Sequence, residues 1–412
     1  MVKSKWRRMS LDQIGDFSKG SGINRAESHT GDIPAVRYGE LYTAHNNYIR
    51  NFVSHISREV ADGAKRVHCG DVLFACSGET KEDIAKCAAV VDDIEAYAGG
   101  DIIILTPRIK VHPVFLGFML NTPEVIKQRS SKAQGDAIVH ISSETLKSIE
   151  ISLPEYHEQT RIASALSNID ELTIKLEALI AKKKAIKYGA MQELLTGKKR
   201  LQGFSGEWQT FIFGELFDFI PNNAFTRAQM SDSGKVKNIH YGDILTKYGA
   251  YVDGGSRTIP YISKEVDLSR FADRCYLQSG DIIVADTAED ETVGKALEVT
   301  NVDCPILAGQ HTLLCRPKIR FADKFLGYYL NAACYHDQLL PYIVGTKVSS
   351  VSKASVAQTK LIVPEYEEQQ AIAEILSNMD AEIEALEQKL AKYHQVKQGM
   401  MQQLLTGKIR LV

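Results

Sequence analysis

The chain has 412 residues, a formal net charge of −2, and a composition that is 44% hydrophobic and 24% charged. This length allows two or three domains with substantial cores, and the near-neutral charge argues against a protein that coats DNA non-specifically through many Lys and Arg contacts to phosphates. No apolar run is long enough to span a membrane, no apolar stretch follows the basic first ten residues, and the seven cysteines form no C-x-x-C pair. We therefore expect a protein of the reducing cytoplasm with free, mostly buried thiols.

The first segment, residues 1–153, mixes the patterns of strands and helices. Short β-rich runs bounded by Gly, Asp or Pro predict strands; they are DVLFAC (71–76), DIIILTP (101–107) and LKSIEISLP (146–154). The stretch HPVFLGFMLNTPEVIKQRS (112–130) carries apolar residues at helical spacing and predicts helix. The segment is expected to form one mixed α/β domain.

Residues 154–201 predict a single long helix with one apolar seam. Pro154 suits a first helical turn, and Gly197 in LLTGK suits a left-handed cap at the helix end. Thr173 and Lys183 interrupt the seam at two of its positions. The remaining seam residues are Ile162, Leu166, Ile169, Leu176 and Ile180.

The rest of the chain repeats this plan at an offset of 210 residues. Residues 202–363 predict a second mixed α/β domain, in which FLGYYLN (325–331) matches FLGFMLN (115–121) at five of seven positions. Residues 364–412 predict a second long helix, and 26 of its first 48 residues are identical to those of 154–201 without a gap. Its apolar residues step 4-3-4-3, as in a coiled-coil seam; they are Ile372, Leu376, Met379, Ile383, Leu386 and Leu390, with Tyr393 at the end. The fold class is therefore α+β, a tandem repeat of domain and helix.

The charges of the two helices predict that they pair antiparallel. The first half of each helix is rich in acids and the second half is rich in bases. Parallel packing would place like charges and aligned dipoles together, whereas antiparallel packing places each acidic half against a basic half. A pairing centred on Leu176 and Leu386 would place Leu166 near Val396 and Ile186 near Leu376.

No reaction can be assembled from the residues of this chain. The sequence has no H-E-x-x-H, no G-x-S-x-G, no metal-spaced Cys/His cluster and no Asn-Pro-Pro-aromatic stretch. We therefore expect no catalytic residue, no metal and no cofactor.

What remains is a set of polar loops at matching places in the two domains. Gly78–Lys86 lies opposite Ala288–Lys295, and Arg37 with Tyr38 lies opposite His240 with Tyr241. Solvated loops would look the same one residue at a time, but their duplication favours a paired binding surface.

The order of domain and helix, with P-E-Y-x-E-Q…L-S-N-I/M-D…M-Q-x-L-L-T-G-K in both helices, resembles the specificity subunit of Type I restriction–modification systems. The resemblance covers the full chain. It implies two target-recognition domains that each read one half of a bipartite double-stranded DNA site. It also implies that the paired helices set the spacer and dock two modification (methyltransferase) subunits, which in turn bring restriction subunits. S-adenosylmethionine, ATP and Mg would then be used by those partners, not by this chain.

Within this resemblance, polar and basic side chains of the matched loops are the candidates for DNA contacts, because such groups hold phosphates or read base edges. A recognition subunit of a Type IIB-like system and a coiled-coil scaffold that binds only proteins remain as alternatives. The candidate DNA-binding residues are Arg37, Tyr38, Lys81, Lys86 and Lys132 in the first domain and His240, Tyr241, Lys247, Lys295 and Lys347 in the second.

Overall fold

The computed structural model describes residues 6–135, 138–345 and 347–411, so the first five residues of the basic N-terminal stretch lie outside the described residues. The chain forms two compact units. Unit 1 contains residues 1–177 together with 388–412, and unit 2 contains residues 178–387. Unit 1 thus combines the first globular part with the first half of the first long helix and the second half of the second long helix. Unit 2 combines the second globular part with the other two helix halves. The unit boundaries lie inside the long helices, whereas the expected domain boundaries at residues 153, 201 and 363 lie where a globular part meets a helix.

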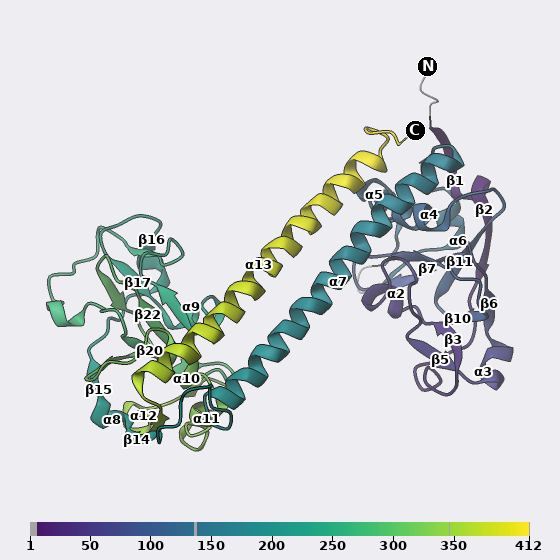
Figure 1. Cartoon of the computed structure of the whole chain (residues 1–412). Coiled ribbons are helices and arrows are strands. Elements are labelled where there is room, and N and C mark those ends of the chain that lie inside the picture. Colours follow the sequence, from purple (N-terminus) through teal and green to yellow (C-terminus); the bar gives the residue numbers. More distant parts are fainter. Residues whose placement is uncertain (1–5, 136–137, 346, 412) are drawn as a thin grey trace. The chain divides into compact units, whose positions relative to one another are not determined.

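In unit 1 two mixed sheets carry the globular part (Figure 1). The order of the first sheet is β2-β11-β7-β9-β4, and that of the second is β5-β3-β10-β6. Two short pairs, β1-β13 and β12-β8, complete the strands of the described part of this unit. The strands are β1 (Arg7–Ser10), β2 (Gly15–Lys19), β3 (Ile33–Val36), β4 (Asn47–Tyr48), β5 (Ser54–Ile56), β6 (Lys65–Val67), β7 (Val72–Ala75), β8 (Ser77–Gly78), β9 (Cys87–Ala89), β10 (Ala96–Ala98), β11 (Ile102–Pro107), β12 (Val139–His140) and β13 (Glu150–Leu153).

The five-stranded sheet and the two short pairs of unit 1 recur in unit 2, whereas the four-stranded sheets differ in one edge strand. The sheets of unit 2 have the orders β15-β24-β20-β22-β18 and β16-β19-β17-β23, and its short pairs are β14-β26 and β21-β25. The strands predicted at 71–76 and 101–107 are confirmed as β7 and β11, and the strand predicted at 146–154 is confirmed as β13, which begins only at Glu150. The strands of unit 2 are β14 (Gln209–Ile212), β15 (Phe217–Ile220), β16 (Met230–Ser231), β17 (Lys237–Ile239), β18 (Tyr251–Asp253), β19 (Tyr261–Ile262), β20 (Ile282–Ala285), β21 (Thr287–Ala288), β22 (Ala296–Thr300), β23 (Ile306–Ala308), β24 (Thr312–Pro317), β25 (Ser349–Ser350) and β26 (Lys360–Val363).

The apolar stretch at 112–130 is two helices, α4 (Pro113–Leu120) and α5 (Pro123–Lys132), where its pattern indicated helix throughout. Thr122 is extended because it precedes a proline, and this ends α4. The Asn121 amide secures the break, since its Nδ2 donates to the Cys87 and Gly117 carbonyls. Unit 2 breaks between α10 (Phe325–Leu330) and α11 (Ala333–His336) without a proline, and Asn331 makes the same bonds to Ala296 and Gly327. The amide bonds are therefore the feature that the two breaks share.

Shorter helices connect these elements within the described residues. In unit 1 they are α1 (Leu11–Ile14), α2 (Glu40–Thr43), α3 (Arg58–Gly63) and α6 (Ser143–Lys147). In unit 2 they are α8 (Phe213–Leu216), α9 (Tyr241–Thr246), α12 (Lys353–Ala357) and the 3-10 turns at Arg227–Gln229, Asp273–Cys275 and Leu340–Tyr342. The seven cysteines are free thiols, and Cys69 and Cys334 are exposed.

The two long helices are α7 (Tyr156–Leu194) and α13 (Tyr366–Leu404). None of the described helices is both long and apolar enough to cross a membrane. The predicted seam positions of α7 lie buried, including Thr173, whose hydroxyl donates to the Asp170 carbonyl. In α13 Ile372, Leu376 and Ile383 are buried, whereas Met379, Leu386 and Leu390 are half-buried. Lys183, the other break in the seam, makes an ion pair with Glu382 at 2.6 Å.

Within each unit the two helices pair antiparallel, as the charges predicted. In unit 1 Lys397 lies 2.5 Å from Asp170, and Arg410, just beyond α13, contacts Glu158 near the start of α7. In unit 2 Lys187 lies 2.5 Å from Asp380 at the corresponding place. Each contact joins an acid in the first half of one helix to a base in the second half of the other helix or just beyond it, and this defines the antiparallel order.

The predicted register of this pairing is wrong by five residues. Since Asp170 faces Lys397, Leu166 one turn earlier faces Met401 rather than Val396. Leu166 is fully buried in a core that includes Met400 and Met401, whereas Val396 is 42% exposed. Ile186 is likewise exposed, whereas Leu376 is fully buried in a core that Ala190 and Met191 pack against. The helix ends determine the register, not the central leucines on which the prediction was centred.

A clasp at each helix end explains this register. In unit 1 the Arg410 guanidinium makes two bonds of 2.6 Å to the Glu158 carboxylate, and the Trp6 ring packs on Gly407. In unit 2 Arg200 makes the same two bonds, of 2.7 Å, to Glu368, and the Trp208 ring packs on Gly197.

Both cap glycines have a positive φ, 69° at Gly197 and 68° at Gly407, as the predicted left-handed caps require. A Cβ at either glycine would also lie within 3.4 Å of the tryptophan ring. Pro154 and Pro364 precede the helices instead of lying in their first turns, and their carbonyls accept bonds from Gln159 and Gln369. The repeated closing phrase is thus half of a clasp whose other half is the opening phrase of the other repeat.

Candidate nucleic-acid interface

In unit 1 three segments meet at the end of β7 through backbone hydrogen bonds. The Cys76 amide donates to the carbonyl of Asp101, at the tip between β10 and β11, and the Ile141 amide donates to the Cys76 carbonyl. The segment that follows Cys76 and the segment that precedes Ile141 pair as β8 and β12, with Ser77 opposite His140. These bonds form a small frame from which the side chains of Ser77, Asp101 and His140 project.

The side chains on this frame line a hollow. The Ser77 hydroxyl and His140 Nδ1 are 3.0 Å apart, and the Cys76 thiol donates weakly to Asp101 Oδ1 at 3.8 Å. Asp101 and His140 are exposed, and burial raises the pKa of the Cys76 thiol, so this sulfur stays protonated at neutral pH. The hollow is lined, among others, by Lys19, Cys76, Ser77, Asp101, His140 and Ser142.

Unit 2 has the same frame at the end of β20. The Asp286 amide donates to the His311 carbonyl, and the Val351 amide donates to the Asp286 carbonyl. Thr287 pairs with Ser350 where β21 meets β25. Each of these residues lies 210 positions after its counterpart in unit 1.

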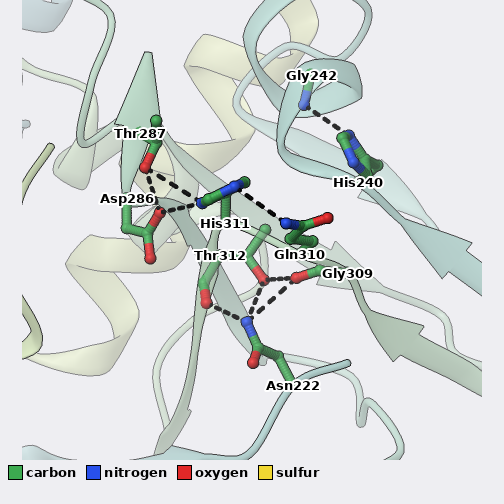
Figure 2. A network of polar contacts seen from close by, with 9 residues as sticks. All are labelled: Asn222, His240, Gly242, Asp286, Thr287, Gly309, Gln310, His311 and Thr312. Atoms are coloured by element: carbon green, nitrogen blue, oxygen red, sulfur yellow. Dashed lines mark hydrogen bonds and ion pairs between the residues drawn. The ribbon is translucent and has the colours of Figure 1, made fainter. Parts of the chain in front are cut away.

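The side chains on the second frame differ from those on the first. Figure 2 shows the His311 ring between the Asp286–Thr287 pair and Gln310. His311 Nδ1 lies 3.8 Å from Asp286 Oδ1 and 3.5 Å from the Thr287 hydroxyl, and its Nε2 lies 3.2 Å from Gln310 Nε2. Asn222 ties the two sides of the tip together, since its Nδ2 donates to the carbonyls of Gly309 and Thr312. The hollow here is lined, among others, by Asn222, Arg270, Arg274, Asp286, Gln310 and His311.

Both tip residues have a left-handed backbone, with φ of 59° at Asp101 and 56° at His311. Side chains other than glycine seldom adopt this region, although Asn, Asp and His do so more often than others. The strain of such a residue persists only where the surroundings hold it, and it is concentrated at functional sites. The same strained position, occupied by two different polar side chains, therefore marks the two tips as candidates for binding.

The structure brings some of the predicted DNA-binding residues to these frames. His240 and Tyr241 lie beside the second tip, because the Tyr241 ring meets the His311 ring edge-on at 5.2 Å. His240 caps α9 by accepting the Gly242 amide at 3.3 Å (Figure 2). Burial, then the nearby Arg227, lowers the pKa of His240, which favours the neutral ring that this cap requires. In unit 1 exposed Tyr38 shares a hollow with Ser77 and Gly78, while Arg37 donates to Ser28.

Four of the predicted lysines are bonded to backbone carbonyls. Lys86 donates to Tyr42 at 3.0 Å, and Lys295 donates to Leu245 and Tyr248 at 3.2 and 2.9 Å, so both hold the end of a short helix. Burial lowers the pKa of both ammonium groups. Lys132 donates to Ser148 and Lys247 to Thr258. Lys81 and Lys347 are exposed. A DNA contact by any of these six lysines remains a prediction.

The residues predicted to bind DNA do not include Ser77, Asp101, Thr287, Gln310 or His311. Their signal was present in the repeat, because the matched strands GDVLF (70–74) and GDIIV (280–284) place Cys76–Ser77 opposite Asp286–Thr287 at the same offset. Among the described residues no group of three His, Cys, Asp or Glu side chains is placed to hold a metal ion.

The chain contains two copies of one α+β fold, each followed in sequence by one long helix and each with a polar hollow on the same backbone frame. These features define a two-domain repeat protein built to bind through matched but different surfaces. A model of the family described as Type I restriction modification DNA specificity domain matches residues 3–188 and again residues 205–393. The chain therefore belongs to this family, as a DNA sequence-specificity subunit with two copies of the domain and a non-catalytic role.

Its relatives agree with this assignment. The chain is 26% identical to the Type I restriction enzyme MjaVIII specificity subunit of Methanocaldococcus jannaschii, over 97% of this chain and 92% of that protein. It is 24% identical to the putative Type I restriction enzyme MjaX specificity subunit of the same organism, over 87% of this chain and 83% of that protein. These matches do not favour a scaffold that binds only proteins.

Solved structures share the fold. The crystal structure of the Type I restriction–modification system S subunit from M. genitalium has a TM-score of 0.61 at 14% identity, and the match covers 98% of this chain and 97% of that one. A chain from a structure on complex assembly and conformational transition of the Type I system has a TM-score of 0.55 at 16% identity, with 98% of both chains covered.

Proposed function

We propose that each globular part reads one half of a bipartite double-stranded DNA site. The observation that carries this proposal is the duplicated backbone frame with unlike side chains, Ser77, Asp101 and His140 in one unit and Thr287, Gln310 and His311 in the other. Base edges in the major groove differ in their donors and acceptors, so unlike polar sets select unlike sequences. Two such readers in one chain give a split recognition sequence.

The paired helices, in this proposal, set the spacer between the half-sites and dock two modification subunits. A chain built from two equivalent repeats offers two equivalent surfaces to two copies of one partner. Restriction subunits would join through those partners. The antiparallel ion pairs Asp170–Lys397 and Asp380–Lys187 support this role, since they occupy corresponding places in the two units and thus give them the same helical surface.

The chemistry would belong to the partners. S-adenosylmethionine, ATP and Mg would be used by the modification and restriction subunits, and this chain would hold no cofactor. Rigorously purified chain is expected to show no methyl transfer, nuclease or ATPase activity, and methyl transfer by the chain alone would contradict this division.

Methylome sequencing of cells with and without the chain tests the proposal. Loss of one bipartite methylated motif is the expected result. Replacing residues 1–153 with the same domain of a relative should change one half of the motif and leave the other half and the spacer intact. Lengthening α7 between Pro154 and Gly197 should change the spacer alone. A domain exchange that altered both halves would show that the units do not read separately.

A further inference from the structure

We propose that base reading in the two half-sites is carried by two unlike sets of side chains on the two matched frames, and this inference rests on the proposed DNA-reading function. The first reading set is Ser77, Asp101 and His140, and the second reading set is Thr287, Gln310 and His311. Each set occupies the three-segment frame of its unit, at the end of β7 or β20.

The frames hold these side chains in a form suited to recognition. Each frame is tied by backbone hydrogen bonds from the strand end to the tip and to the third segment, at 2.9 and 3.1 Å in unit 1 and at 3.2 and 2.9 Å in unit 2. Polar groups placed by rigid elements discriminate between partners better than groups on loose loops. Asp101, His140 and His311 are exposed, and Gln310 is half-exposed, so their polar atoms are accessible to a partner.

The charges of these groups favour bases over phosphates. A carboxylate repels a phosphate, yet Asp101 is exposed at the first tip and Asp286 supports the second. The cations of the same hollows, Lys19 in unit 1 and Arg270 with Arg274 in unit 2, are suited to the flanking phosphates. Each hollow therefore combines a cation for the DNA backbone with neutral or acidic groups for base edges.

The two sets select different base edges. The Asp101 carboxylate only accepts hydrogen bonds, so it requires an amino group, which cytosine N4 or adenine N6 presents in the major groove. The Gln310 amide both donates and accepts, and this pattern matches N7 and N6 of adenine. The first half-site should thus contain a base with an amino group opposite Asp101, and the second should contain adenine opposite Gln310.

The test uses the full chain in complex with its modification subunits and a DNA library randomised across both half-sites. Asp101→Asn keeps the size of the side chain and suits a left-handed backbone, but it adds a donor. It should reduce the preference at one position of the first half-site about tenfold or more and leave the second half-site unchanged. Gln310→Glu should do the reverse, because it removes the donor that adenine N7 requires.

A matched control is Asp92→Asn, which removes an exposed acid near the opposite end of β7. It should leave both half-sites as they are. If the Asp101 and Gln310 variants keep the selected sequence of the unsubstituted complex, or lose affinity equally for all sequences, the reading sets are wrong although the proposed function stands. If the unsubstituted complex selects no bipartite sequence, the proposed function itself fails.

Discussion

The two clasps at the helix ends and the two frames at the strand ends have diverged to different degrees. Glu158–Arg410 and Glu368–Arg200 use the same residue types, the same atoms and bonds within 0.1 Å of one another. The frames share their backbone bonds, but Cys76, Ser77 and Asp101 of one stand where Asp286, Thr287 and His311 stand in the other. Parts that serve both units in the same way have stayed the same, and the unlike side chains lie where the two units would differ in what they bind.

The largest expected effect tests the likeness of the helical parts. Leu166 and Leu376 hold corresponding places and are both fully buried. Substitution of either by Ala should lower the free energy of unfolding by about 2–5 kcal/mol, because each leaves a cavity in a packed core. Denaturant titration of the two variants measures this loss. Losses that differed by more than about 2 kcal/mol would show that the two cores are not equivalent.

A second effect sharpens the difference between the units. Glu298 of β22 is buried and accepts bonds from the amides of Lys324 and Gly327, whereas Ala89 occupies the corresponding place in unit 1. Burial raises the pKa of Glu298 from 4.5 to about 7. Between these values the native chain keeps a proton that the unfolded chain has lost, so stability falls as the pH rises through this window.

The size of this fall is about 3 kcal/mol. Glu298→Gln, which stays neutral, should remove the fall, and thermal unfolding measured between pH 4.5 and 8 detects it. Ala89→Ser is the control, since it adds a small group without a charge that titrates in this window. An unchanged pH dependence in Glu298→Gln would contradict a raised pKa at this carboxyl.

The smallest effect on stability is expected from exposed cysteine pairs that test the helix register. Glu177 lies 3.6 Å from His394, and Lys184 lies 2.6 Å from Glu387 at the corresponding place in unit 2. In a background without the seven native cysteines, cysteines at each of these pairs should be joined by a short bifunctional thiol reagent. Cysteines at Asn168 and His394, which the centred register would bring together, should not be joined. Efficient linkage of this last pair would restore the predicted register.

Much of the fold could be predicted from the sequence because it rests on local periodicity and on the repeat. The seams around Leu166 and Leu376 and the strand at 101–107 are strong local patterns. The break at Asn121 was not predicted, since the apolar spacing continues across it, although Pro123 marks it in the sequence. The Asn121 bond to Cys87, a distant residue, appears only in the folded chain. The register was missed for the same reason, because it depends on Trp6 packing against Gly407 at the far end of the sequence.

The candidate site was predicted only in part. The prediction of DNA contacts rested on basic residues such as Lys86 and Lys295, but their ammonium groups bond to carbonyls of their own unit. Asp101 was not predicted because its negative charge does not suit a phosphate contact. Gln310 was not predicted because the corresponding residue of the first repeat is Gly100, which has no side chain. Only the folded chain shows that strand end, tip and third segment meet at one place.

The most direct test of the account transfers one reading set to the other frame. Gly100→Gln with Asp101→His, Cys76→Asp, Ser77→Thr and His140→Ser would build the second set on the first frame, and the Cβ added at Gly100 would meet only the Gly22 carbonyl oxygen, at 3.7 Å. His occupies the same left-handed position at 311. Selection of DNA by the variant complex should show the first half-site taking on the base preference of the second at the positions read, while the second half-site and the spacer stay unchanged. A first half-site that kept its original preference, with binding intact, would contradict the claim that these frames carry the readers.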